Sequence, residues 1–130
     1  MEAFDTNVVV RLLVGDDVEQ CRRAELVFHA ALSAGGVWLS SVVLVEVAWV
    51  LRGAYKFDRA TIVERLRKFL ATKGVRVEDP DLAQAALDAY ETGPADFADY
   101  FILETARRGG MLPLRTFDEK LSRSEGAELV

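Results

Sequence analysis

The chain is poor in the residues that build disulfide frameworks and nitrogen- or sulfur-ligated metal sites. It has one cysteine, Cys21, and one histidine, His29, in 130 residues. A single cysteine excludes an internal disulfide and fits a reducing cytoplasm, which is the compartment we expect. His29 has no cysteine or histidine partner at ligand spacing, so we expect it on a helix flank and not on a metal.

Several motifs and segments are also missing. No apolar run reaches the roughly 18–20 residues of a membrane span, and the start of the chain does not resemble a signal peptide. Neither a Gly-x-Gly-x-x-Gly nor a Gly-x-x-x-x-Gly-Lys-Ser/Thr motif occurs, which argues against dinucleotide and P-loop binding. A serine or cysteine nucleophile would lack a positioned base, and the segment after Asp5 lacks the second acid of an aspartyl-phosphate phosphatase. We therefore expect no membrane association and no bound organic cofactor.

Charge is unevenly distributed, although the formal net charge of −5 argues against general attraction to nucleic acid. Residues 52–76 contain eight basic residues and two acids, whereas residues 78–104 contain eight acids and no base. A basic face beside an acidic pocket would suit a phosphate-bearing substrate. Alternatively, the basic residues form only the solvated side of one helix. The sequence leaves both interpretations open.

The order of apolar segments predicts one α/β domain over residues 1–130. About half of the residues are apolar, enough for a buried core. We expect strands at residues 2–5, 37–40, 75–78 and 111–116, with a last edge strand at 127–130, and helices between them. This alternation indicates a mainly parallel sheet.

The helix boundaries follow from capping signals. Thr6 or Asn7 is expected to cap a helix that ends before Gly15, and Asp16 or Asp17 the next one. Ser41 is expected to cap a helix over 42–51, which should be buried on most faces with Glu46 in its middle. A further helix is expected over 59–73 with Asp58 as its cap, and another over 80–92 with Asp79-Pro80 marking its start. The last helix, over 96–108, should be largely buried, Ile102 included.

Four acids from distant segments are the candidate catalytic residues. Asp5 and Asp118 follow strands, and Glu46 and Asp99 lie early in helices, so all four can meet beyond the carboxyl ends of the strands. Carboxylates held this close repel one another unless cations are present. Oxygen ligands without histidine or cysteine select hard ions such as Mg²⁺ or Mn²⁺, an arrangement suited to phosphodiester cleavage.

The remaining candidates are polar neighbours of these acids. Thr6, Asn7 and Thr116 offer neutral groups that could orient the ligands. Asp96 and Asp99 are three residues apart and share a helix face, so either could be the acid at that position.

Four stretches of this sequence, in this order and covering almost the whole chain, resemble a PIN domain of the VapC toxin type. They are Phe4-Asp5-Thr6-Asn7-Val8, Ser40-Ser41-x-x-x-x-Glu46, Asp96-Phe97-Ala98-Asp99-Tyr100-x-Ile102 and Leu114-x-Thr116-Phe117-Asp118. The resemblance implies a three-layer α/β/α sandwich and a ribonuclease dependent on Mg²⁺ or Mn²⁺. Asp5, Asp99 and Asp118 would bind the metal and, with Glu46, form the catalytic quartet. Asp99 is preferred to Asp96 because Tyr100-x-Ile102 follows it as in the family's pattern.

The resemblance also assigns supporting roles and partners. Thr116 would hydrogen-bond within the site and Asn7 would brace Asp5. The substrate would be RNA, and a small antitoxin would hold the toxin inactive along an apolar groove; such toxins commonly form homodimers. Trp49 and Val50 could line that groove or could belong to the core.

Two other functions fit the same sequence. A PIN-like RNA-binding or scaffold protein without turnover would keep the fold but would not bind Mn²⁺. A structure-specific DNA nuclease or a phosphatase would use the same metal chemistry on another substrate. Assays on RNA, single-stranded DNA and a small phosphoester would separate these.

Overall fold

A computed structural model describes residues 1–130, which divide into two compact units, Met1–Pro80 and Asp81–Val130. Each unit has its own small parallel sheet, and every strand pair in the chain is parallel. The predicted α/β class with mainly parallel strands is therefore confirmed. That residues 1–130 act as one domain stays a prediction.

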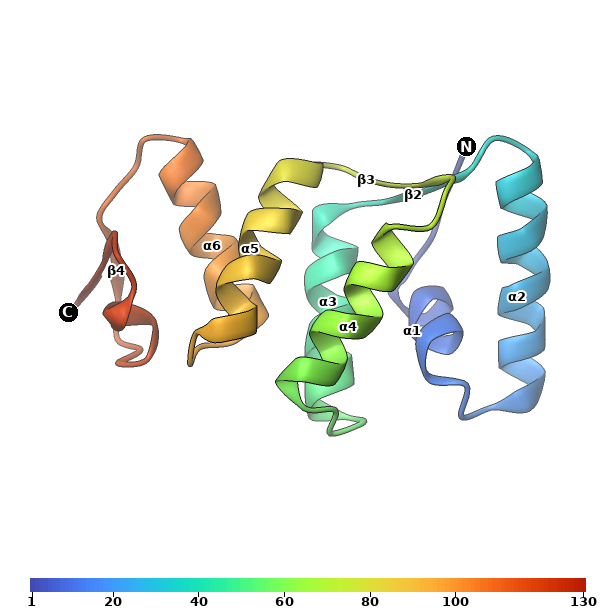
Figure 1. Cartoon of the computed structure of the whole chain (residues 1–130), viewed down its shortest axis with the longest axis horizontal. Coiled ribbons are helices and arrows are strands. Elements are labelled where there is room, and N and C mark those ends of the chain that lie inside the picture. The colour runs from blue at the N-terminus through green and yellow to red at the C-terminus, as the bar shows by residue number, and fades with distance from the viewer. The chain divides into compact units, whose positions relative to one another are not determined.

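The first unit is built on three short strands in the order β1-β2-β3, namely β1 (Glu2–Ala3), β2 (Val37–Leu39) and β3 (Val75–Val77). Parallel neighbours need crossover connections, and helices provide both of them (Figure 1). Gly36 is required where β2 begins. Its φ is 116°, and a Cβ there would lie 2.5 Å from the carbonyl oxygen of Gly74.

Four helices complete this unit: α1 (Thr6–Val14), α2 (Val18–Ser33), α3 (Ser41–Gly53) and α4 (Arg59–Leu70). Helix α1 packs against both α2 and α3, and α3 packs against α4. Val9 and Val10 of α1, Leu44 and Val47 of α3 and Ile62 of α4 are buried. Burial of these aliphatic side chains holds α1 and α3, which carry two of the candidate acids, in place.

The prediction that α3 is buried on most faces is wrong. Val42 is 68% exposed and Trp49 is 72% exposed, and Glu46 is exposed as well. These three residues are four and three positions apart, so they share one face of the helix. Trp49 is consequently not a core residue, and one whole face of α3 is open in this unit.

The capping predictions are right for two of these helices and off by one residue for a third. Asp17 and Asp58 accept hydrogen bonds from the backbones of Gln20 and Thr61 and cap α2 and α4. Helix α3 is capped by Ser40, whose Oγ accepts from the backbone N–H of Val43 at 3.1 Å, and not by Ser41. Ser41 is already helical, and only the extended residue before it can cap.

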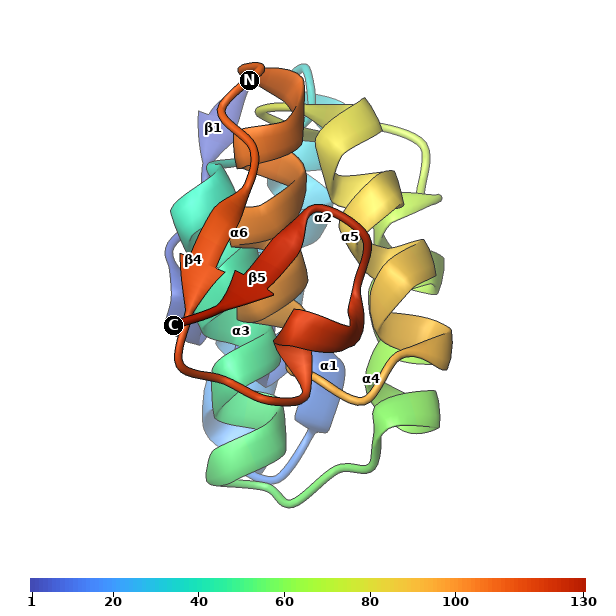
Figure 2. The ribbon, with the colours of Figure 1, turned by 90° about the vertical axis from the view of Figure 1, so that its left-hand side faces the viewer.

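The second unit contains α5 (Pro80–Thr92), α6 (Phe97–Arg108), β4 (Leu114–Thr116), the 3-10 turn η1 (Leu121–Arg123) and β5 (Ala127–Leu129). Figure 2 shows β4 and β5 side by side with η1 in the connection between them. The rings of Tyr90 in α5 and Phe97 in α6 meet edge to face, with centroids 5.9 Å apart. Ile102 was expected in the core but is 54% exposed, so α6 has an exposed face too.

The expected helix α4 was too long by three residues, and the expected strands were longer than the two or three residues observed. None of the helices combines the length and the apolar character needed to cross a membrane.

Candidate functional site

Asp5 stands where the chain turns from β1 into α1. Its backbone is extended (φ −82°, ψ 163°), and its Oδ1 accepts a hydrogen bond from the backbone N–H of Thr6 at 2.7 Å. Asp5 is therefore the N-cap of α1, and the prediction that Thr6 or Asn7 takes that role is wrong. Thr6 is already in the helix, so its own side chain is free for another contact. Asp5 itself is exposed.

Thr6 links the first acid to the second. Its side chain is buried, and its Oγ1 donates to Glu46 Oε1 at 3.0 Å. The same residue thus donates its backbone N–H to Asp5 and its hydroxyl to Glu46. Glu46 was expected to be a buried carboxylate; it is exposed, and the Thr6 hydroxyl holds one of its oxygens. The two candidate acids of Met1–Pro80 are therefore tied together through one threonine.

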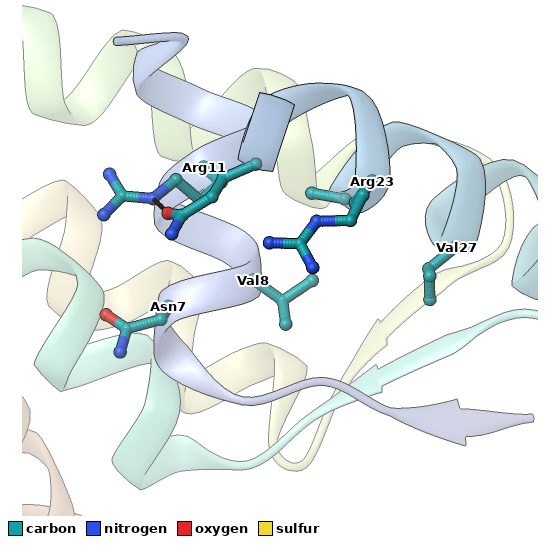
Figure 3. Close-up of a pocket in the computed structure, with 7 residues that line it drawn as sticks. Asn7, Val8, Arg11, Arg23 and Val27 are labelled. Atoms are coloured by element: carbon teal, nitrogen blue, oxygen red, sulfur yellow. Dashed lines mark hydrogen bonds between the residues drawn. The ribbon is translucent and has the colours of Figure 1, made fainter. Parts of the chain in front are cut away.

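Asn7 and Val8 face a separate cavity of about 530 Å³ between α1 and α2. Figure 3 shows Asn7, Val8 and Arg11 on α1 and Arg23 and Val27 on α2, with Arg23 extending toward α1. Nη1 of Arg11 donates to Asp16 Oδ1 at 2.9 Å and to the hydroxyl of Tyr55 at 2.6 Å. The cavity is thus partly aliphatic and bordered by two guanidinium groups.

The basic segment around α4 contains at least one structural arginine. Nη1 of Arg65 donates to the carbonyl oxygen of Leu13, and its guanidinium lies 5.2 Å from the centroid of the Phe57 ring. Lys68 and Lys73 are exposed. Arg65 is one of the basic residues that were considered for binding a phosphate-bearing substrate. In the structure it instead holds α4 against α1.

The second unit has an acidic pocket of about 380 Å³. It is lined by Pro94, Ala95, Asp96, Asp99, Asp118, Glu119 and Lys120. Asp96 is the N-cap of α6, and its backbone N–H donates to Asp99 Oδ2 at 3.0 Å. The two aspartates between which the sequence left a choice thus lie in one pocket, where Asp96 is exposed and Asp99 half-buried.

Asp118 is held from both sides along the chain. Its backbone N–H donates to Thr116 Oγ1 at 2.9 Å, and its Oδ1 accepts from the backbone N–H groups of Lys120 at 2.8 Å and Leu121 at 3.2 Å. Leu121 is buried and anchors the turn. Thr116 was predicted to hydrogen-bond within the site, and its bond goes to the backbone of Asp118. Oδ2 of Asp118 is left for a ligand.

Burial raises the pKa of Asp99 above its ordinary value. The backbone N–H of Asp96 opposes this shift, while the negative charges of Asp118 and Asp96 add to it. The shift shows that Asp99 and Asp118 are close enough to interact electrostatically. A cation in this pocket would relieve that repulsion.

The donor chemistry suits a hard divalent cation, but the structure assembles no complete set of ligands. All candidate ligands are carboxylate or hydroxyl oxygens, the ligands of Mg²⁺ and Mn²⁺. No group of three or more acidic, histidine or cysteine side chains in the structure is arranged to hold a metal. Asp5 and Glu46 belong to Met1–Pro80, and Asp99 and Asp118 belong to Asp81–Val130.

Two pocket residues were not predicted from the sequence. Glu119 and Lys120 line the acidic pocket directly after Asp118. The only feature of the sequence that could have indicated these two residues is their position in the turn directly after Asp118. His29 is exposed on α2, and Cys21 donates its thiol to the carbonyl oxygen of Arg11.

Comparison with known proteins identifies the fold family. Among solved structures, Mycobacterium tuberculosis VapC20, described as a sarcin-ricin loop cleaving toxin, is similar at 20% identity and a TM-score of 0.47, with 98% of each chain covered. No curated protein matched the sequence. The family model described as PIN domain matches residues 3–126, which confirms the predicted PIN-like α/β fold. Because this match takes in nearly the whole chain, the protein belongs to the PIN-domain family.

Proposed function

We propose that this protein is an endoribonuclease that depends on Mg²⁺ or Mn²⁺ and acts as the toxin of a type II toxin–antitoxin pair. The proposed catalytic quartet is Asp5, Glu46, Asp99 and Asp118. The observation that carries the proposal is the pocket of Asp96, Asp99 and Asp118, in which the pKa of Asp99 is raised. Membership of the PIN-domain family supports it.

The chain's own residues would prepare the site for hydrolysis. A bound divalent ion supplies activation of a water molecule and neutralisation of charge on the phosphate. The Thr6 hydroxyl fixes the Glu46 carboxylate, and two backbone N–H groups orient Asp118. Asp5, Asp99 and Asp118 would hold the ion. The cap of α1 uses only Oδ1 of Asp5, and the turn after β4 uses only Oδ1 of Asp118. The Oδ2 atom of each aspartate is therefore available to the ion.

Partners follow from the same proposal. The substrate is RNA, the compartment is the cytoplasm, and an antitoxin restrains the enzyme, which forms a homodimer. The cavity between α1 and α2 supports the proposal of an antitoxin partner, because Val8 and Val27 lie beside Arg11 and Arg23 there (Figure 3). A segment that combines aliphatic and acidic side chains would complement it.

Exchange of single acids tests the proposed activity. We expect Asp5→Asn and Asp99→Asn each to lower the rate of RNA cleavage in Mg²⁺ by about 100-fold or more, because each removes a charge that the metal needs. Asp17→Asn is the matched control, since Asp17 caps α2 outside the quartet and asparagine caps equally well. Wild-type cleavage by either quartet variant would contradict the mechanism. Single-stranded DNA and a small phosphoester, assayed in parallel, test the choice of RNA.

A further inference from the structure

Lys120 is the one basic residue among those that line the acidic pocket of the second unit. The other charged side chains there are Asp96, Asp99, Asp118 and Glu119. Lys120 nevertheless forms no ion pair or side-chain hydrogen bond with any of them. Lys120 is exposed and its ammonium group has no partner, so the group is available to an incoming anion.

The backbone fixes Lys120 relative to the candidate catalytic acid. Its N–H donates to Asp118 Oδ1 at 2.8 Å, and the next residue, Leu121, donates to the same oxygen and is buried. The Cα of Lys120 therefore moves with the Asp118 carboxylate. Its flexible side chain can reach a ligand beside that carboxylate without disturbing the turn.

The proposed reaction brings a suitable anion to this position. Each RNA phosphodiester carries one negative charge, and charge on its oxygens grows as water attacks. An ammonium group aimed at those oxygens stabilises the transition state more than the ground state. Carboxylates alone would repel the same phosphate, and a cation of the chain would offset this repulsion together with the metal.

We propose that Lys120 binds a non-bridging oxygen of the RNA phosphate that is cleaved next to Asp118. This inference rests on the proposed ribonuclease function and adds a substrate-binding residue to it. The side chain acts as a point charge, so arginine can replace it in binding but glutamine cannot.

Lys120→Gln, Lys120→Arg and Arg123→Gln form a matched set. Arg123 lies in the same turn and is exposed, but it does not line the pocket. Binding of a short labelled single-stranded RNA is measured by fluorescence anisotropy in EDTA at several salt concentrations. Cleavage in Mg²⁺ is measured separately as kcat and KM, and thermal unfolding verifies that each variant is folded.

We expect Lys120→Gln to raise the Kd for RNA several-fold and to reduce the slope of log K against log salt by about 0.7, the loss of one phosphate contact. It should also lower kcat/KM by about tenfold or more, since the contact strengthens in the transition state. Lys120→Arg should stay close to wild type. If Lys120→Gln matches Arg123→Gln in both binding and cleavage, the inference is wrong.

The two proposals fail separately. RNA cleavage that is lost in Asp5→Asn but unaffected by Lys120→Gln overturns only the role of Lys120. Loss of RNA binding in Lys120→Gln, in a protein that does not cleave RNA, overturns the ribonuclease and leaves Lys120 as an RNA contact without a cleaved phosphate.

Discussion

The charge on Asp99 opposes folding when no cation is present. Burial raises its pKa from 3.8, and the nearby charges of Asp118 and Asp96 add to the effect. Between pH 3.8 and the raised value, the folded chain binds a proton that the unfolded chain releases. Stability contributed by this residue therefore falls as pH rises through that window and is constant above it.

We expect Asp99→Asn to be more stable than wild type at pH 7 in EDTA, with the difference vanishing as the pH falls toward 4. Asparagine keeps an oxygen that can accept from the backbone of Asp96, so the start of α6 is preserved. Urea unfolding across this pH range measures the difference. Asp81→Asn, at an exposed acid of α5, controls for loss of a carboxylate elsewhere in the unit. An Asp99→Asn variant that is less stable than wild type at pH 7 would contradict the raised pKa of Asp99.

At the scale of single residues, the choice of the four acids stays a prediction, and the sequence did not reveal their surroundings. Segment 42–51 is almost entirely apolar, so its periodicity could not reveal which face is buried. The charged residue Glu46 lies on the exposed face of this helix, and Val42 and Trp49 lie on the same face at helical spacing. Asp5 was predicted to be a ligand and not a cap. A carboxylate has two oxygens, and in the structure one of them caps α1.

Among the elements, the start of α3 gives a test with an internal control. Ser40 Oγ accepts from the backbone of Val43, whereas the side chain of Ser41 makes no such bond. We expect Ser40→Ala to lower the free energy of unfolding by about 1 kcal/mol, because a helix donor loses its partner. Ser41→Ala should change it by less than about 0.5 kcal/mol, since only its backbone N–H contacts Glu78.

Chemical denaturation of both serine variants measures this difference. A larger loss from Ser41→Ala than from Ser40→Ala would return the cap to Ser41, as the sequence had predicted, and equal losses would contradict Ser40 as the sole cap. The helix starts at Asp17, Asp58 and the Asp79-Pro80 pair were predicted, because capping depends on local chemistry. The cap of α1 was not, since Asp5 takes that role. The ends of α5 and α6 were predicted too, but α4 was expected three residues too long. Strand lengths were not predicted, because tertiary hydrogen bonds such as Val37 N–H to the Gly74 carbonyl decide them.

For the whole molecule, the alternation of strands and helices and the order of four motifs were enough to predict the family, and the PIN-domain match confirms it. The pairing order β1-β2-β3 and the pairing of β4 with β5 could not be predicted. Strand partners are chosen by contacts between residues far apart, such as Val37 with Val75 and Leu114 with Ala127. The acids, too, are divided between two units that the sequence did not separate.

The proposed ligands Asp5 and Asp118 can each be tested for a contribution to metal binding. We expect Mn²⁺ at 100 times its Kd to stabilise the wild-type protein by about 2.7 kcal/mol relative to EDTA, because the ion binds only the folded chain. Asp118→Asn in one unit and Asp5→Asn in the other should both lose most of this gain, whereas Asp17→Asn should keep it. Thermal unfolding with and without Mn²⁺ measures all four proteins. If Asp5→Asn keeps the full gain while Asp118→Asn loses it, the ion is held by Asp81–Val130 alone, and Asp5 serves α1 as a cap and not the metal as a ligand.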